Sequence, residues 1–86
     1  MDIQPQTVED RVKAVVARVF HRNVGLLNRN TRFVEDLKAK PFTITELIAD
    51  LEVEFGIDIP KVEVRKSNTI GETVDIIENF QSKQSG

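Results

Sequence analysis

The sequence contains no cysteine, no tryptophan, no tyrosine and a single histidine, His21, among its 86 residues. Without cysteine, neither a disulfide nor a thiolate zinc site can supplement the thin hydrophobic core of so small a domain. One histidine does not make a metal site, so we expect no bound metal. The chain also lacks a glycine-rich phosphate loop and any nucleophile–base pair that we can identify, so we do not expect an enzyme.

Long apolar runs are absent as well. No run approaches membrane-spanning length, and residues 1–6 do not form a basic-then-apolar leader. The remaining composition, 40% hydrophobic and 30% charged, is that of one folded domain. We therefore expect a cytoplasmic monomer that does not bind a membrane, in which residues 7–81 form a single domain between a flexible start (1–6) and a flexible tail (82–86).

Charge is distributed unevenly along the chain, although the net charge is only −2. Residues 1–40 carry eight Lys or Arg against five Asp or Glu, and residues 41–86 carry four against nine. The basic residues of the first half are not interleaved with aromatic residues, and they form no known nucleic-acid-reading motif. We therefore expect a solvated loop and no nucleic-acid partner for the basic cluster Arg22, Arg29, Arg32, Lys38 and Lys40.

Five valines with the spacing of one helical face predict a first helix over Val8–Phe20. Thr7, followed three residues later by Asp10, gives a helix start in the right place. From residue 23 to residue 40 the helical period is lost, which predicts a long loop. We expect five apolar side chains to hold this loop against the core: Leu26, Leu27, Phe33, Val34 and Leu37.

Three further helices are predicted after the loop. Apolar residues return to the helical period up to Phe55, and Gly56 supplies a left-handed stop. Pro60 opens a short third helix that ends near residue 66. Thr69 and Glu72 have capping-box spacing at the start of the last helix, whose expected inner face is Ile70, Val74, Ile77 and Phe80. Three longer helices and one short helix predict an all-α four-helix bundle with a long helix 1–2 loop.

The segments Phe33–Leu37 and Leu51–Pro60, with Glu46-Leu47 between them, resemble the central stretch of acyl carrier proteins. Residues 69–77 resemble the last helix of that family, and residues 8–12 resemble its first helix. The similarity covers about residues 7–80 in order and without gaps. It implies the phosphopantetheine-type carrier fold and a role in metabolism of the fatty-acid, polyketide or nonribosomal-peptide type.

The family carries acyl chains on a 4'-phosphopantetheine arm, which is attached to the serine of an Asp-Ser-Leu signature that opens helix 2. A helix N-terminus suits the arm's phosphate because it presents free N–H groups and positive dipole. Here Lys40-Pro41-Phe42 stands at the signature. Pro41 has no hydroxyl to accept the arm, Lys40 reverses the charge of the signature aspartate, and Lys38 replaces a small residue. The resemblance therefore implies a variant that carries no cofactor.

The residues around Pro41 allow two interpretations of where the second helix begins. Pro41 itself suits the first helical position. Alternatively, the run from Thr43 to Glu46 is a capping box, with Phe42 and Leu47 as the hydrophobic staple around it. We favour the second interpretation, in which the helix begins at Thr43 and the ring of Phe42 is buried against Leu47. Phe42→Ala would then destabilise the fold.

The outward face of the second helix carries Glu46, Asp50 and Val53, with Ala49 and Glu54 on its flanks. Residues 41–55 contain four acids and no base, which fits an ordinary solvated face and a docking surface equally well. In the family, partner enzymes hold this helix through basic patches, so the resemblance favours docking to enzymes or proteins of acyl, lipid or natural-product biosynthesis.

Two alternatives to an unloaded docking protein stay open. The first is a true carrier that is loaded at a non-standard hydroxyl, Thr43 or Thr45. The second is a helical bundle that binds an acyl chain or lipid noncovalently.

Overall fold

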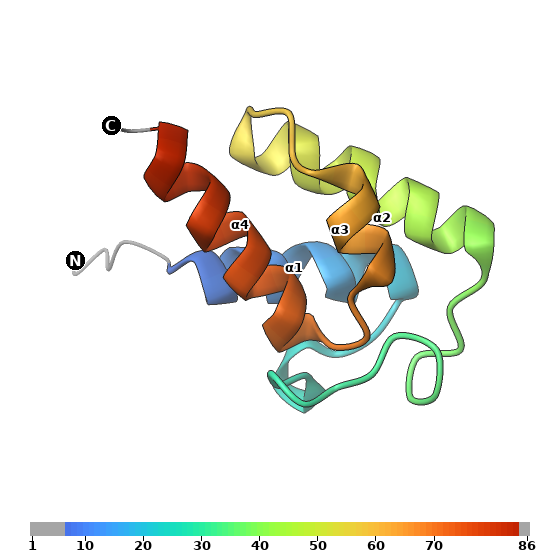
Figure 1. Cartoon of the computed structure of the whole chain (residues 1–86). Coiled ribbons are helices and arrows are strands. Elements are labelled where there is room, and N and C mark those ends of the chain that lie inside the picture. Colours follow the sequence, from blue (N-terminus) through green and yellow to red (C-terminus); the bar gives the residue numbers. More distant parts are fainter. Residues whose placement is uncertain (1–6, 85–86) are drawn as a thin grey trace, which may run out of the picture.

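The computed structural model describes residues 7–84 and contains four α-helices, with no strand in that part of the chain (Figure 1). The elements run in the order α1 (Val8–Phe20), the 3-10 turn η1 (Val24–Leu26), α2 (Pro41–Phe55), α3 (Lys61–Lys66) and α4 (Ile70–Gln84). α1 packs against α2 and α4, and the short α3 bridges α2 and α4. The predicted all-α architecture of three longer helices and one short helix is confirmed.

α1 has the bounds that the valine spacing predicts. The Thr7 hydroxyl accepts a hydrogen bond from the backbone N–H of Asp10 at 3.0 Å, so the predicted start is confirmed. His21 ends the helix in the left-handed conformation, with φ of 57°. Three of the five valines, Val12, Val15 and Val16, are completely buried. The period outweighs the weak helix propensity of valine because burial of this face stabilises the helix.

Three of the five loop residues expected in the core are buried: Leu27, Phe33 and Leu37. The prediction is wrong for Leu26 and Val34, which are 78% and 63% exposed. Each of them is the neighbour of a buried residue, and adjacent side chains of a turn cannot both point inward. Phe33 fixes the loop, because its N–H donates to the carbonyl of Asn68 and its ring stacks on Phe20.

The end of α2 and the start of α4 follow the predicted cap chemistry, whereas α3 begins at Lys61, with Pro60 as its N-cap residue and not as its first helical residue. Gly56 ends α2 with φ of 65°, and its N–H donates to the carbonyl of Glu52. At the start of α4 the Thr69 hydroxyl accepts from the N–H of Glu72, and the Glu72 carboxylate accepts from the N–H of Asn68. The predicted start of the last helix is therefore confirmed, with Asn68 in place of Thr69 as the second donor.

α4 buries Ile70, Val74 and Ile77, while Phe80 is half-buried. The helix extends to residue 84, so residues 82–84, expected in the tail, are helical. The expected flexible start, residues 1–6, and residues 85–86 lie outside the described part of the chain. No helix within residues 7–84 is both long enough and apolar enough to cross a membrane. The core combines buried side chains from all four α-helices, the long loop and the connection between α2 and α3: Val12, Val15, Val16, Leu27, Phe33, Leu37, Leu47, Ile48, Leu51, Ile59, Val64, Ile70, Val74 and Ile77.

Candidate functional site

α2 begins at Pro41, and the prediction of a start at Thr43 is wrong. Lys40 is the N-cap residue, with extended backbone angles and no side-chain hydrogen bond to the first turn. Its carbonyl accepts from the N–H of Thr43 at 2.9 Å and from that of Ile44 at 3.1 Å. Proline suits the first helical position because its φ is already helical and its missing N–H would have no intrahelical partner there. This stronger backbone constraint prevails over the Thr43 capping box.

Phe42 is 69% exposed, so the prediction that its ring is buried against Leu47 is also wrong. The reason is the phase of the helix. Nine residues separate Phe42 from the completely buried Leu51, and at about 100° per residue the two side chains leave the helix in opposite directions. Once α2 begins at Pro41, the ring must therefore face away from the core.

The two threonines proposed as alternative attachment points lie inside α2, beyond its first residue. Thr43 is half-buried. The Thr45 hydroxyl donates to the carbonyl of Pro41 at 3.2 Å and accepts from the Arg65 guanidinium of α3 at 3.0 Å. A hydroxyl engaged on both sides is poorly placed to attack a phosphate.

The four acids of α2 are not equivalent, because three of them form ion pairs with other helices. Glu54 binds Arg11 of α1 at 2.9 Å, and the same guanidinium donates to the Glu54 carbonyl and lies 4.3 Å from the centre of the Phe55 ring. Asp50 lies 4.0 Å from Arg18, also on α1.

Glu52 pairs with Lys61 at the start of α3 at 3.0 Å and accepts from the N–H of Ile59. The hydrogen bond to the Glu52 carboxylate raises the pKa of Lys61 above its ordinary value. Glu46 makes no ion pair with any residue in the described range 7–84. Of the four acids, only Glu46 is therefore wholly available to a partner.

Four of the exposed side chains of α2 form one line, which we call the α2 stripe: Phe42, Glu46, Ala49 and Val53. Their spacing of four, three and four residues keeps them on one side of the helix. Two of the predicted partner-binding residues, Glu46 and Val53, belong to the stripe, and Val53 is 83% exposed. Asp50 lies at its edge. Glu54, the fourth predicted residue, is turned toward Arg11 and lies outside the stripe.

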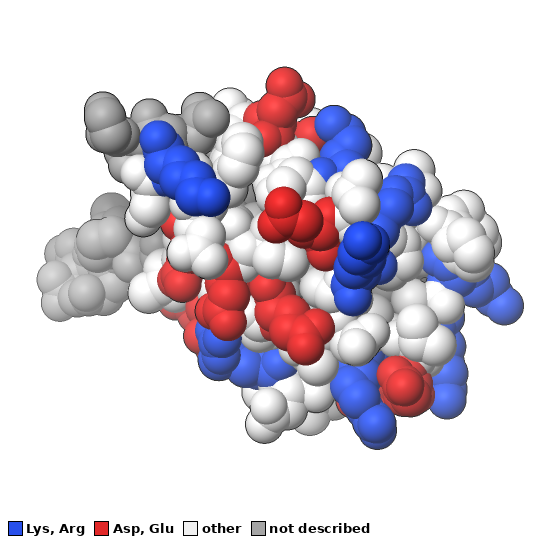
Figure 2. All heavy atoms as spheres, in the orientation of Figure 1, with Lys and Arg blue, Asp and Glu red and all other residues white. Residues whose placement is uncertain are grey.

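Positive charge surrounds the start of α2, and no acidic residue lies in its first turn. Lys40 is exposed, and the Lys38 ammonium donates to the carbonyl of Glu35 at 3.0 Å. Arg65 reaches this end of the helix from α3 through its bond to Thr45. Figure 2 shows Lys and Arg side chains gathered on the side where α2 begins and α3 ends, while most acidic side chains lie toward α4. The proximity of Arg65 could not be predicted, because Arg65 and Thr45 lie 20 residues apart.

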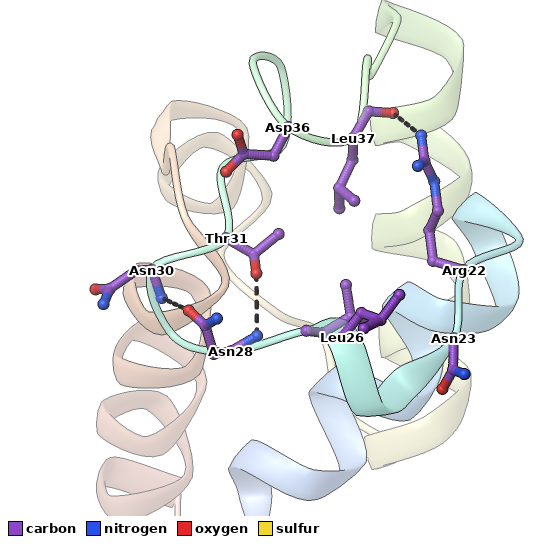
Figure 3. A pocket seen from close by; sticks show the side chains of 9 residues that line it. Arg22, Asn23, Leu26, Asn28, Asn30, Thr31, Asp36 and Leu37 are labelled. Carbon is purple, nitrogen blue, oxygen red and sulfur yellow. Dashed lines mark hydrogen bonds between the residues drawn. The ribbon is translucent and has the colours of Figure 1, made fainter.

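A separate cavity of about 430 Å³ lies in the α1–α2 loop, and no residue of α2 lines it (Figure 3). Its floor is formed by leucines such as Leu37, whose carbonyl accepts a 3.4 Å bond from the Arg22 guanidinium. Thr31 also lines the cavity, and its hydroxyl accepts a hydrogen bond from the backbone N–H of Asn28 at 3.0 Å. Within residues 7–84, no group of acids and histidine is arranged to hold a metal ion.

Residues 10–77 match the family model described as "Phosphopantetheine attachment site". The acyl carrier proteins of Rickettsia canadensis (strain McKiel) and Rickettsia prowazekii (strain Madrid E) are each 36% identical to this chain over 75 residues. The alignment covers 87% of this chain and 87% of each relative. The matched region contains all of α2 and α3 and most of α1 and α4.

Proposed function

Because the chain belongs to the acyl carrier protein family, we propose that it serves acyl metabolism as a carrier-like protein that is not loaded with phosphopantetheine and that docks to partner enzymes through α2. The family consists of carriers without catalytic activity, which confirms the prediction that the chain is not an enzyme. The pathway, of the fatty-acid, polyketide or nonribosomal-peptide type, is not specified by these residues.

The observation that supports the unloaded state is the position of Pro41. The resemblance puts the family's signature serine at this position, and Pro41 is the first residue of α2, so a later helix start does not bring another hydroxyl there. A phosphodiester needs an acceptor oxygen, and the proline side chain has none. Loading at Thr45 is disfavoured by the bonds that hold its hydroxyl to Pro41 and Arg65.

Intact mass spectrometry of the chain, coexpressed with a permissive phosphopantetheinyl transferase, tests the proposal that the chain is not loaded. We expect the unmodified mass. The matched control is the triple variant Lys40→Asp, Pro41→Ser, Phe42→Leu, which rebuilds the Asp-Ser-Leu signature on the same helix and should gain one arm. An arm on the unaltered chain, at Thr43, Thr45 or any serine, would contradict the proposal. Solvent extraction of the same preparation for fatty acids tests the noncovalent lipid-binding alternative.

The single variant Pro41→Ser separates the missing oxygen from the reversed charge. Lys40 stays at the N-cap in this variant and still opposes a transferase that expects an aspartate. We therefore expect poor loading of Pro41→Ser and better loading when Lys40→Asp is added. If the single variant is loaded as well as the triple variant, Lys40 has no part in excluding the transferase.

Docking through α2 is tested with purified acyl-carrier-dependent enzymes and the variants Glu46→Lys and Asp50→Lys. Exposed charges at an interface mainly set association rate and salt dependence, so each reversal should weaken binding most at low salt. Glu78→Lys on α4 is the matched control, because Glu78 is exposed and has no ion pair within residues 7–84. If the α4 reversal abolishes binding and the α2 reversals do not, α2 is not the docking helix.

A further inference from the structure

We propose that Phe42, together with Lys40 and Arg65, is an anchor that enters an apolar pocket bordered by carboxylates on the partner protein. The inference rests on the proposed docking through α2. The inference concerns the part of the partner's surface that faces the start of α2. That part is expected to be acidic, whereas the part that faces Glu46 is expected to be basic.

The first observation is the isolation of the Phe42 ring. The chain has five phenylalanines. Phe33 is buried and the other three are half-buried, whereas Phe42 is 69% exposed. It makes no aromatic or cation–π contact within residues 7–84. A phenyl ring held on the first turn of a helix has few rotatable bonds, so its burial in a partner orders little and removes much apolar surface from water.

The second observation is the positive charge at the start of α2, the end of the helix that carries the ring. Lys40 forms no ion pair within residues 7–84, and Arg65 is held by a hydroxyl, not by a carboxylate. The first turn of α2 contains no acid, so the positive end of the helix dipole adds to the field. The groups that complement this field are carboxylates. The apolar pocket that receives the ring should therefore be bordered by Asp or Glu.

An anionic membrane is the other surface that attracts an aromatic ring with basic neighbours, but Glu46 argues against it. Glu46 lies one turn after Phe42 on the α2 stripe, about 6 Å along the helix axis, and it has no ion pair with any residue between 7 and 84. Asp50 follows at the edge of the stripe. A uniformly negative bilayer would repel both carboxylates, whereas a protein surface can present acids to Lys40 and bases to Glu46.

Two synthetic amphipathic helices with the same leucine face provide the direct test, one with glutamate and one with lysine at all polar positions. Titration of the ¹⁵N-labelled full chain should shift the resonances of Lys40, Phe42 and Arg65 with the glutamate peptide. The lysine peptide should shift the resonance of Glu46 instead. Phe42→Ala should reduce the affinity of the chain for the glutamate peptide about tenfold, as expected for an aromatic anchor. Lys40→Glu should reduce the affinity for the glutamate peptide at low salt and should reduce it much less at high salt.

The matched controls are Leu26→Ala, which truncates a side chain of η1 that is 78% exposed, and Lys83→Glu at the end of α4. Both should bind the glutamate peptide like the unaltered chain, and the amide spectrum of each variant shows whether its fold is intact. Equal affinity of Phe42→Ala and the unaltered chain would overturn the inference. So would Phe42-dependent binding to phosphatidylglycerol vesicles without binding to the glutamate peptide, which would identify a membrane anchor.

Failure of the anchor can be told apart from failure of the docking proposal. With a purified carrier-dependent enzyme, weaker binding of Glu46→Lys but unchanged binding of Phe42→Ala overturns only the anchor. Unchanged binding of both variants overturns docking through α2 as well. Weaker binding of both, with Leu26→Ala unchanged, supports both proposals.

Discussion

The two ends of α2 use their charged side chains in opposite ways. At the C-terminal end, Asp50, Glu52 and Glu54 each face a basic residue of α1 or α3, and Gly56 closes the last turn. At the N-terminal end, Lys40 provides no side-chain cap and has no ion pair within residues 7–84. The C-terminal end is therefore joined to α1 and α3 by ion pairs, whereas within residues 7–84 the N-terminal end is joined to α3 only by the hydrogen bond from Arg65 to Thr45.

This difference shows that the number of charges on a helix does not identify a docking surface. Composition gives four acids on one helix and treats them alike. Their contacts separate Glu54, which bonds twice to Arg11, from Glu46, whose carboxylate has no hydrogen bond or ion pair within residues 7–84. A charge that is already paired has to lose its internal partner before it can bind a new one, so the unpaired charge is the better candidate for recognition.

The largest expected effect distinguishes the buried face of α2 from its exposed start. Leu51→Ala removes a completely buried side chain and should lower the free energy of unfolding by about 2–5 kcal/mol. Phe42→Ala should change it by less than about 0.5 kcal/mol, as is usual for a surface substitution. Urea unfolding of both variants measures this, and a large loss of stability in Phe42→Ala would show that the ring is buried after all.

The next effect concerns the two arginines that bind the C-terminal end of α2. Arg11→Ala removes an ion pair, a bond to a backbone carbonyl and a cation–π contact with Phe55, so we expect a loss of about 1–2 kcal/mol. Arg18→Ala removes one exposed pair at 4.0 Å and should cost about 0.5 kcal/mol or less. Thermal unfolding at low and high salt compares them. Equal losses would mean that the contacts of Arg11 add nothing to stability.

A smaller effect of opposite sign is expected at the start of the helix. Lys40 has the extended backbone of an N-cap residue but no cap bond, so Lys40→Asp can supply the missing acceptor without a change of backbone. The Lys40→Asp variant should therefore be more stable by about 1 kcal/mol. Its affinity for the glutamate peptide should be lower. Lys40→Ala, which cannot cap, is the control for stability. A destabilised Lys40→Asp would show that Lys40 has a structural role.

The smallest expected effect concerns Asp36 in the loop before α2. Its side chain bonds to another residue of the same loop, as the acids at the C-terminal end of α2 bond to α1 and α3. Its carboxylate accepts from the backbone N–H of Arg32 at 2.8 Å and from the Arg32 guanidinium, and these bonds lower its pKa below the ordinary 3.8. A lowered pKa in the folded state gives stability that is present above the ordinary value and is lost as pH falls through the folded value. Asp36→Asn should therefore be less stable than the unaltered chain at neutral pH, and the difference should shrink in acid. Urea midpoints from neutral pH down to below pH 3.8 measure it.

Much of the fold follows from local chemistry. The bounds of α1, the Gly56 stop and the Thr69 start depend on residues within one turn of each other, and the predictions at these places are confirmed. The error at the start of α2 has a different origin. Two local signals compete there, and the sequence pattern does not rank them; in the structure the helical backbone of Pro41 prevails over the Thr43 capping box.

The four helices, their buried faces and the absence of a hydroxyl at Pro41 follow from residue type and from spacing along the chain. The positions of Arg65 beside Thr45 and of Arg11 beside Glu54 depend on how the helices pack. Arg11 and Glu54 are 43 residues apart, and no periodicity connects them. Such pairs exist because packing of the helices brings distant side chains within hydrogen-bond reach, and that packing determines which charges of α2 remain free.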